Sequence, residues 1–306
     1  MDEIERMLLE KVAELHKLPD GAYNIRKDGA GDGRRSTENI RIENRTDGKT
    51  GIDIFVAAGT RGESVHIPVV ITKSDFRETV YNDFYVGEGA DVTIIAGCGI
   101  HNCGLSDSEH SGVHTFHIAR GARVKYVERH YADGDGNGKN IMNPASVLYL
   151  AEDSYLDMET TQIKGVDSTL RSTKAELKAG AQLVVREKIY THGSQRAETS
   201  FTVDLNGEGA AADVVSRSVA SEKSVQKFVS FINGNAPSRG HTECDAIIMD
   251  EAAVTAVPSL AANDVNAELI HEAAIGKIAG EQLTKLMSLG LDEKQAEETI
   301  IKGFLS

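Results

Sequence analysis

The chain has 306 residues, 40% of them hydrophobic, so it is long and apolar enough for one large globular domain or two ordinary ones. Its formal net charge of −14 leaves no dominant basic surface to displace counterions from a phosphate backbone, which argues against nucleic acid as a partner. No apolar run approaches the ~18 residues of a membrane span. Three cysteines and an N-terminus without the basic start of a signal peptide predict free thiols in a reducing cytoplasm.

The first 50 residues predict a helix followed by a polar loop. Apolar residues recur at helical spacing from residue 4 to residue 16, and Pro19 and Gly21 mark the end of this helix. Residues 26–46 are polar and rich in glycine, which indicates a loop or an irregular cap. We therefore expect residues 1–50 to form an N-terminal segment ahead of a β-rich core.

From residue 51 onward, short β-rich runs alternate with Gly or Asp-Gly. A small residue, any residue and then Val or Leu recur along this region, with steps of 32, 32, 27, 31 and 40 residues. The motif starts at Ala90, Ala122, Ser154, Ala181, Ala212 and Ala252. A loose period near ~30 residues favours a β-solenoid, in which successive coils stack strand on strand. An antiparallel β-sandwich with strands of similar length is the alternative.

Side chains that can bind iron or accept sulfur lie near the end of this region. Cys244 stands between Glu243 and Asp245, and His271 and Glu272 follow 27 and 28 residues later. Thiolate, imidazole and carboxylate groups bind iron. With a coil of ~30 residues, Cys244 and the His-Glu pair fall on adjacent strands, ~4.8 Å apart. Strand alternation sends His271 and Glu272 to opposite faces unless a bulge intervenes.

The residues next to Cys244 bear on whether its thiol is ionised. Negative charges on Glu243 and Asp245 disfavour a thiolate unless these carboxylates point away or bind metal themselves. The alternative role for Cys244 is that of a small buried hydrophobic residue.

A second group of potential ligands lies upstream. Cys98, His101 and Cys103 form a C-x2-H-x-C pattern, and three further histidines follow by residue 117. This spacing suits a metal site, although it matches neither a structural zinc motif nor a catalytic H-E-x-x-H. Buried turn residues are the alternative.

Two short helices are predicted after residue 276. The first covers residues 281–289 and stops at Gly290, and the second begins with Asp292 as N-cap and Gln295 as its capping-box partner. Their apolar stripes consist of Leu283, Leu286, Met287, Ala296, Ile300 and Phe304. Such stripes either cap the core of the solenoid or dock a partner, and periodicity alone favours the cap.

Four stretches resemble the SufB/SufD family of iron–sulfur cluster assembly proteins, and most of all its short SufB-like branch of archaea and anaerobic bacteria. They are YNDFYVGEGADVTIIAGCGIHN, GHTECDAIIMD, IHEAAIGKIAGEQLTKLMSLGL and KQAEETIIKGFL. The resemblance implies a right-handed parallel β-helix core over residues 51–275 and a C-terminal helical segment over residues 276–306. It also implies a separate SufC-type ABC ATPase that docks on the C-terminal helices.

The resemblance further implies roles for the ligand-type residues. Cys244 matches the cysteine on which the SufB cluster is built, and Glu272 of the HEA motif matches a proposed second ligand. SufD-type partners carry a histidine at the position of His271, facing the SufB cysteine across a subunit interface, so a homodimer of this chain supplies both kinds of ligand. In longer SufB proteins an acidic residue precedes the HEA motif, but here it is Ile270. The cysteine motifs of their N-terminal region are also missing.

The sequence thus predicts a cytoplasmic, non-enzymatic scaffold that holds a transient iron–sulfur cluster. It would receive sulfur from a donor and pass the cluster to apo-proteins, with ATP hydrolysed by another chain, because the Gly-rich stretches here lack a complete phosphate-binding motif. Two alternatives remain. One is a carbohydrate-active β-helix enzyme using Glu243, Asp245 and Glu272 as acids. The other is a structural partner that only recruits the ATPase.

Overall fold

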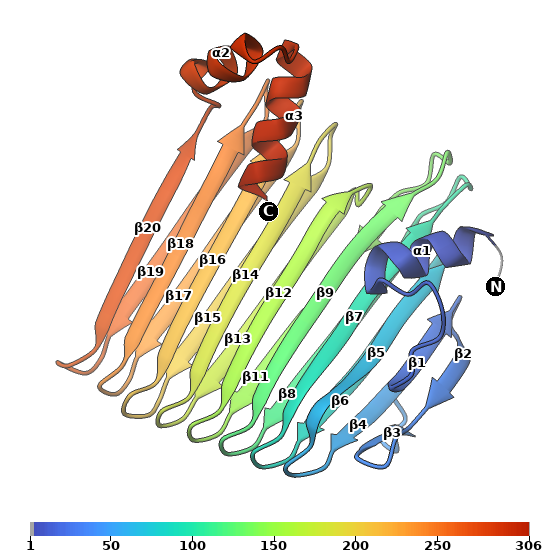
Figure 1. Ribbon diagram of the computed structural model, residues 1–306, viewed down its shortest axis with the longest axis vertical. Helices are drawn as coiled ribbons and strands as arrows, with labels where there is room; N and C mark the ends of the chain where they lie inside the picture. The colour runs from blue at the N-terminus through green and yellow to red at the C-terminus, as the bar shows by residue number, and fades with distance from the viewer. Residues whose placement is uncertain (1–2, 306) are drawn as a thin grey trace.

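The computed structural model describes residues 3–305, which form two ten-stranded sheets, A and B, with helices at both ends (Figure 1). Sheet A contains, in spatial order, β2 (Ala30–Arg35), β1 (Ala22–Lys27), β5 (Arg61–Ile71), β7 (Asp91–His101), β9 (Arg123–Asp133), β12 (Tyr155–Lys164), β14 (Gln182–Thr191), β16 (Ala211–Ala220), β18 (Arg239–Ile248) and β20 (Glu268–Gly276). Sheet B contains β3 (Ile40–Asn44), β4 (Gly51–Val56), β6 (Phe76–Val86), β8 (Ser108–Ile118), β10 (Asn140–Met142) in line with β11 (Ala145–Leu150), β13 (Ser168–Leu177), β15 (Arg196–Leu205), β17 (Val225–Gly234) and β19 (Ala253–Ala262).

The chain alternates between the two sheets, so each coil adds one strand to each of them. Strands of successive coils pair in parallel, for example β14 with β16 and β15 with β17. Antiparallel pairing occurs only near the N-terminus of the described chain, between β1 and β2 and between β3 and β4. The predicted β-solenoid with helical ends is therefore confirmed, and the antiparallel sandwich is wrong.

The small residue of the repeat stands just before a strand of sheet A. Ala90, Ala122, Ser154 and Ala181 are almost fully buried at this position. The fifth equivalent position is Ala210 and not Ala212, since Leu183 pairs with Ala212 and Ala210 precedes β16. The motif is matched two residues later in the sequence, at Ala212, because the third residue counted from the structural start at Ala210 is Ala212 and not Val or Leu. Ala252 precedes β19 and so belongs to sheet B.

The core lies between the sheets. Along β15 every second residue is buried, which is the pattern of a strand with one face in a core and the other toward solvent. The inward residues form one continuous apolar cluster that runs from Ala22 and Ile40 to Ile232 and Cys244. Stacking of coils, rather than any single coil, therefore buries the apolar surface.

The N-terminal segment joins the solenoid more closely than the predicted loop implied. Helix α1 (Glu3–Ala13) lies on the outer face of sheet A, where a Cβ atom at Gly97 would come within 2.6 Å of the Val12 carbonyl oxygen. A Cβ atom at Gly99 would lie 3.0 Å from that of Leu8, so both glycines permit this close approach. The expected loop at residues 26–46 instead contains most of the β1–β2 hairpin and β3, which extend the two sheets.

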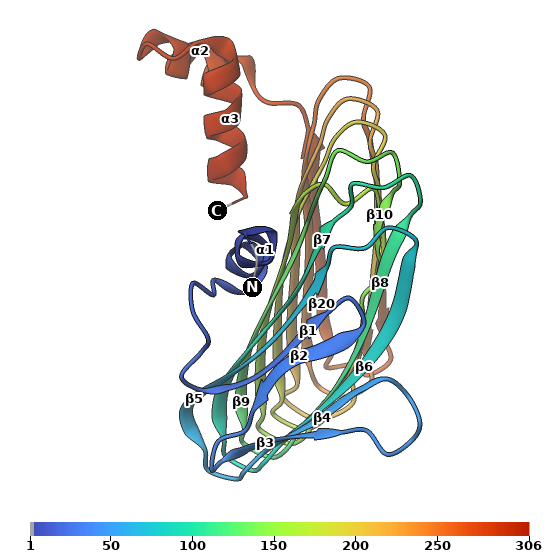
Figure 2. The ribbon, with the colours of Figure 1, turned by 90° about the vertical axis from the view of Figure 1, so that its right-hand side faces the viewer.

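The two C-terminal helices form where they are predicted. Helix α2 spans Gly280–Ser288 and α3 spans Glu293–Phe304, with the predicted capping box between Asp292 and Gln295. Figure 2 shows both on the same side of the solenoid as α1. The interior remains partly open at the last coil, because Leu260 of β19 is 36% exposed although its neighbour in register, Ile232 of β17, is fully buried. Among the described residues, no helix is both long and apolar enough to cross a membrane.

Candidate functional site

Cys244 lies inside the solenoid, on the last strand but one of sheet A. Its side chain is 1% exposed and belongs to the main apolar cluster. In the parallel register of the sheet, its neighbours are Ser216 on β16 and Ala273 on β20. The thiol therefore faces the interior close to the open end of the fold.

His271 shares this interior face. It pairs with Thr242 on β18, which is fully buried, and paired residues of a parallel ladder point to the same side of the sheet. His271 lies on the neighbouring strand, two residues before Ala273, which is the register partner of Cys244. The Cα atoms of Cys244 and His271 are therefore ~8 Å apart. The Nδ1 atom of His271 is buried and has no hydrogen-bond partner among the described residues. A buried imidazole nitrogen without a partner, on the same face as a thiol, can bind the same metal or cluster as that thiol.

Glu272 lies on the opposite, outer face of sheet A. It pairs with Glu243, and β18 and β20 run in continuous register without a bulge, so alternation separates Glu272 from Cys244. The structure therefore brings Cys244 and His271 to one face and leaves Glu272 on the other. Glu243 also faces outward, away from the thiol.

The outer face holds a cluster that the sequence analysis did not identify. Ligand atoms of His241, Glu243 and Glu272 all lie within 4.8 Å of one another. His241 Nδ1 is 2.8 Å from Asp213 Oδ1 on β16, and His241 Nε2 is 3.8 Å from Glu272 Oε2. The signal was present in the sequence, because residues 241 and 243 are two apart and therefore point to the same side of a strand.

Electrostatics favour the protonated form of the Cys244 thiol. Burial, together with the negative charges of Glu187 and Asp245, raises the pKa of Cys244 to about 12. A hydrogen bond with Asp245, helped by partial burial, raises the pKa of Glu243. Binding of iron to Cys244 must therefore displace a proton, and the positive charge of the metal favours that loss.

The upstream ligand residues occupy two different environments. Cys98 on β7 is buried in a second apolar cluster, and burial raises its pKa well above the usual value. Cys103 lies beyond the end of β7 and is exposed, with its sulfur 3.0 Å from His101 Nε2. The Nδ1 atom of His101 is 2.7 Å from Asp133 Oδ1. The structure thus pairs Cys103 with His101 but places Cys98 in the interior.

A buried polar network occupies the interior between these regions. Glu128 is 2.5 Å from Arg171, whose guanidinium also lies 3.2 Å from His130 Nδ1. Burial alone raises the pKa of Glu128, but the charges of Arg171 and the nearby histidines outweigh it and hold the pKa well below its usual range. Burial lowers the pKa of His130 to about 3, and it also lowers that of His114. His114 joins this network through Tyr126, whose hydroxyl donates to Glu128. His110 pairs instead with Glu78.

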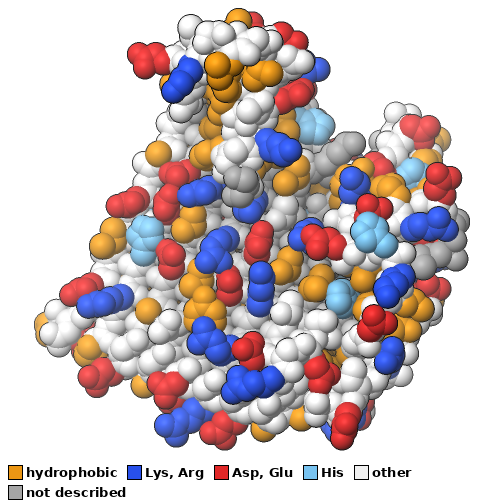
Figure 3. All heavy atoms as spheres, in the orientation of Figure 1, with side chains coloured by type: hydrophobic (Ala, Val, Ile, Leu, Met, Phe, Trp, Pro, Cys, Tyr) orange, Lys and Arg blue, Asp and Glu red, His pale blue; other side chains and the backbone are white. Residues whose placement is uncertain are grey.

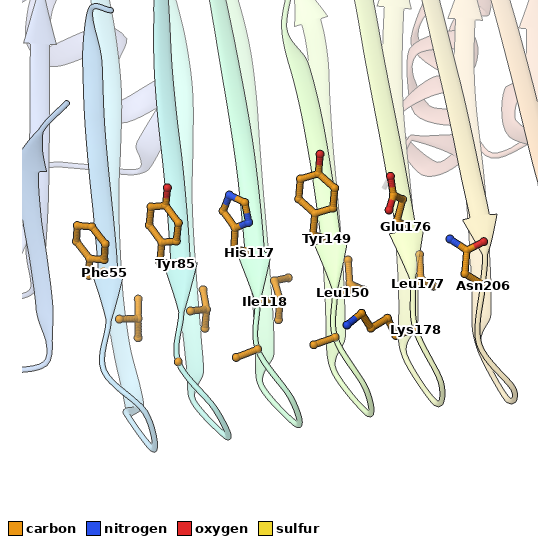
Figure 4. A pocket seen from close by; sticks show the side chains of 15 residues that line it. Phe55, Tyr85, His117, Ile118, Tyr149, Leu150, Glu176, Leu177, Lys178 and Asn206 are labelled. Atoms are coloured by element: carbon orange, nitrogen blue, oxygen red, sulfur yellow. The ribbon is translucent and has the colours of Figure 1, made fainter. Parts of the chain in front are cut away.

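A groove of about 620 Å³ crosses the ends of the sheet B strands (Figure 4). Along it, the rings of Phe55, Tyr85, His117 and Tyr149 stack on successive strands with centroids 4.7 to 5.3 Å apart. Because the rings cover one another's faces, they offer mainly edges, whereas sugar-binding platforms use open faces. The groove also lies on the opposite sheet from Glu243 and Glu272, which weakens the carbohydrate-enzyme alternative.

The comparisons with known proteins agree with this architecture. Residues 72–304 match the family model for the SufBD core domain of SUF system FeS cluster assembly. An iron–sulfur cluster assembly SufBD family protein of Methanocaldococcus jannaschii is 28% identical over 272 residues, covering 88% of this chain and 85% of that protein. One from Methanothermobacter thermautotrophicus is 29% identical over 240 residues, and there the match covers 75% of this chain but only 55% of the relative. One from Archaeoglobus fulgidus is 28% identical over 249 residues, 80% of this chain and 66% of that protein. The chain belongs to the SufBD family, and this membership implies a role in iron–sulfur cluster assembly.

Proposed function

We propose that this protein is the scaffold subunit of a Suf-type assembly complex and holds a nascent iron–sulfur cluster without being an enzyme itself. Sulfur comes from a donor protein, and the finished cluster passes to apo-proteins in the cytoplasm. The observation that carries the proposal is the juxtaposition of Cys244 and His271 on one interior face of a SufBD-family solenoid. Because the cluster is passed on to other proteins, the scaffold needs ligands that bind it reversibly.

In this proposal Cys244 supplies a thiolate and His271 supplies its unpartnered nitrogen. A ligand set that mixes sulfur and nitrogen holds a cluster less firmly than four thiolates, which suits release. Glu272 joins the set only if β20 shifts by one residue or a second chain presents it, because it lies on the outer face. Cys103 with His101 is a secondary metal site in the same scheme, and Cys98 contributes only if the interior opens.

The C-terminal helices are the proposed docking surface for a SufC-type ABC ATPase. We divide the chain accordingly into residues 1–50, the β-helix core at 51–275 and this segment at 276–306. Helix α2 has no buried residue, and Met287 is 44% exposed. The proposed contact residues are Leu283, Leu286, Met287, Ile300 and Phe304. Leu283, Leu286, Ile300 and Phe304 are only partly buried, and a partly exposed apolar stripe of this kind favours docking over capping.

A homodimer is the proposed assembly of two chains. Strands β19 and β20 are the C-terminal edge strands of the two sheets, with unpaired backbone groups along one side. Pairing with a second copy would cover Ile270 and Leu260 and bring a second Cys244–His271 pair nearby. Ile270→Lys, which adds a charge at this edge, is expected to shift the mass in light scattering from dimer to monomer.

The experiment that tests the scaffold role is cluster transfer. The protein is reconstituted anaerobically with iron and sulfide, then mixed with an apo-ferredoxin, and the ferredoxin spectrum is followed. Wild type is expected to transfer its cluster, and Cys244→Ser is expected to transfer none. Equal transfer by Cys244→Ser and wild type would remove the scaffold proposal and favour the structural partner that only recruits the ATPase.

A further inference from the structure

The outer face of sheet A, near its free β20 edge, carries a preformed set of metal-binding atoms. The ligand atoms of His241, Glu243 and Glu272 lie within 4.8 Å of one another. With metal–ligand bonds of ~2.1 Å, two donors on opposite sides of one ion are ~4.2 Å apart. Small side-chain rotations therefore suffice for all three residues to bind one ion.

His241 is already oriented for this role. Its Nδ1 atom lies 2.8 Å from Asp213 Oδ1, so Nδ1–H donates to the carboxylate and the lone pair of Nε2 is free. That free nitrogen points toward Glu272, whose Oε2 atom is 3.8 Å away. A carboxylate that holds the second nitrogen of a ligating histidine is the usual arrangement around protein-bound metals.

The negative charge around His241 also favours binding of a cation. The carboxylates of Asp213, Glu243 and Glu272, from three adjacent strands, lie around the imidazole of His241 on one face, while Arg217 lies farther along, in register with Asp245. Figure 3 shows that the face formed by sheet A otherwise mixes acidic and basic side chains. Like charges this close repel one another, and a divalent ion offsets that repulsion.

We propose that His241, Glu243 and Glu272 bind a divalent first-row transition metal, with Asp213 as a positioning residue. One nitrogen and carboxylate oxygens suit Fe²⁺, Mn²⁺ or Zn²⁺, and three protein ligands leave open positions through which the ion exchanges. The choice of Fe²⁺ as the natural ligand rests on the proposed scaffold function, whereas the existence of the site does not. The site is distinct from Cys244, which faces the interior.

The test is an anaerobic titration of the full-length protein with Fe²⁺, and with Co²⁺ as a visible-absorbing probe. Wild type is expected to bind one ion per chain at this site. His241→Ala and Glu243→Gln are expected to weaken binding at least ~10-fold, and Asp213→Asn by ~10-fold through loss of orientation. Glu159→Gln is the matched control, because Glu159 is a carboxylate on the same face that pairs with Lys188.

The outcomes separate this site from the cluster site. Cys244→Ser is expected to keep wild-type affinity for Fe²⁺ and Co²⁺ while losing the cluster. Wild-type affinity in both His241→Ala and Glu243→Gln, with circular dichroism showing folded proteins, would overturn the proposed metal site. Metal binding that depends on His241 in a protein that transfers no cluster would leave the site standing and contradict the scaffold function instead.

Discussion

The face on which each ligand lies depends on the length of one coil. From Cys244 to His271 is 27 residues, and the coil there is 29 residues long, since Cys244 pairs with Ala273. The difference of two residues is even, so His271 joins Cys244, while the odd difference for Glu272 sends it outside. A coil of 30 residues, close to the loose period of the sequence, would have paired Cys244 with Ala274 and placed Glu272, instead of His271, on the face of the thiol. The sequence therefore predicted adjacent strands, but its period was too imprecise to predict the face.

His271→Ala is predicted to destabilise the bound cluster without preventing folding. Its imidazole supplies an interior ligand, so its loss should speed cluster loss to an added chelator at least ~10-fold. The measurement is the decay of visible absorbance after anaerobic reconstitution. His192→Ala, at the end of β14, is the control and should decay like wild type. Indistinguishable decay of His271→Ala and wild type would exclude His271 as a ligand.

Arg171→Met is predicted to cost roughly 3–5 kcal/mol in free energy of unfolding, because it leaves the carboxylate of Glu128 buried without its cationic partner. The double variant Glu128→Gln with Arg171→Met should recover part of that loss. Urea unfolding of wild type and both variants measures the difference. A loss below ~1 kcal/mol in Arg171→Met would show that solvent reaches this interior pair.

Among whole elements, the helices were the most predictable and the N-terminal strands the least. Helical spacing and the capping box of Asp292 and Gln295 are local signals, and both appear in the structure. The β1–β2 hairpin was missed because its sequence, rich in Gly and Asp, has no strand-like alternation. Its pairing instead comes from contact with β5, a tertiary effect that local sequence does not encode.

Leu286→Asp on α2 is predicted to abolish co-purification with a SufC-type ATPase, since it places a charge within the proposed apolar contact. Thr284→Asp puts the same charge on an exposed residue of the same helix and should retain the complex. Size-exclusion chromatography of the co-expressed pair gives the stoichiometry. If both variants hold the ATPase as wild type does, the contact lies elsewhere on the chain.

At the scale of the whole molecule, the solenoid has an interior that is apolar in one part and ionic in another. The ionic part makes stability dependent on pH. His130 and His114 have lowered pKa values in the folded state, so the unfolded chain takes up protons below pH ~6.5 that the folded chain does not. Stability is therefore expected to fall as the pH drops from ~6.5. Glu187, whose pKa is raised by burial, acts in the opposite direction at lower pH.

The prediction is a loss of up to ~1.4 kcal/mol per pH unit between about pH 6.5 and pH 5 from His130, whose pKa lies below this range, with a further loss in the same direction from His114. Urea unfolding at several pH values in this range measures it. A free energy of unfolding that stays constant from pH 7 to pH 5 would mean that these histidines titrate normally, and hence that the interior is hydrated.

The cluster content of the reconstituted protein tests the central assignment most directly. Iron and acid-labile sulfide are counted per chain after anaerobic reconstitution of wild type, Cys244→Ser and Cys103→Ser. Wild type and Cys103→Ser are predicted to retain equal amounts of cluster, and Cys244→Ser to retain almost none. Full iron and sulfide content in Cys244→Ser, with loss in Cys103→Ser, would contradict the account and move the cluster from the interior of the last coils to the exposed end of β7.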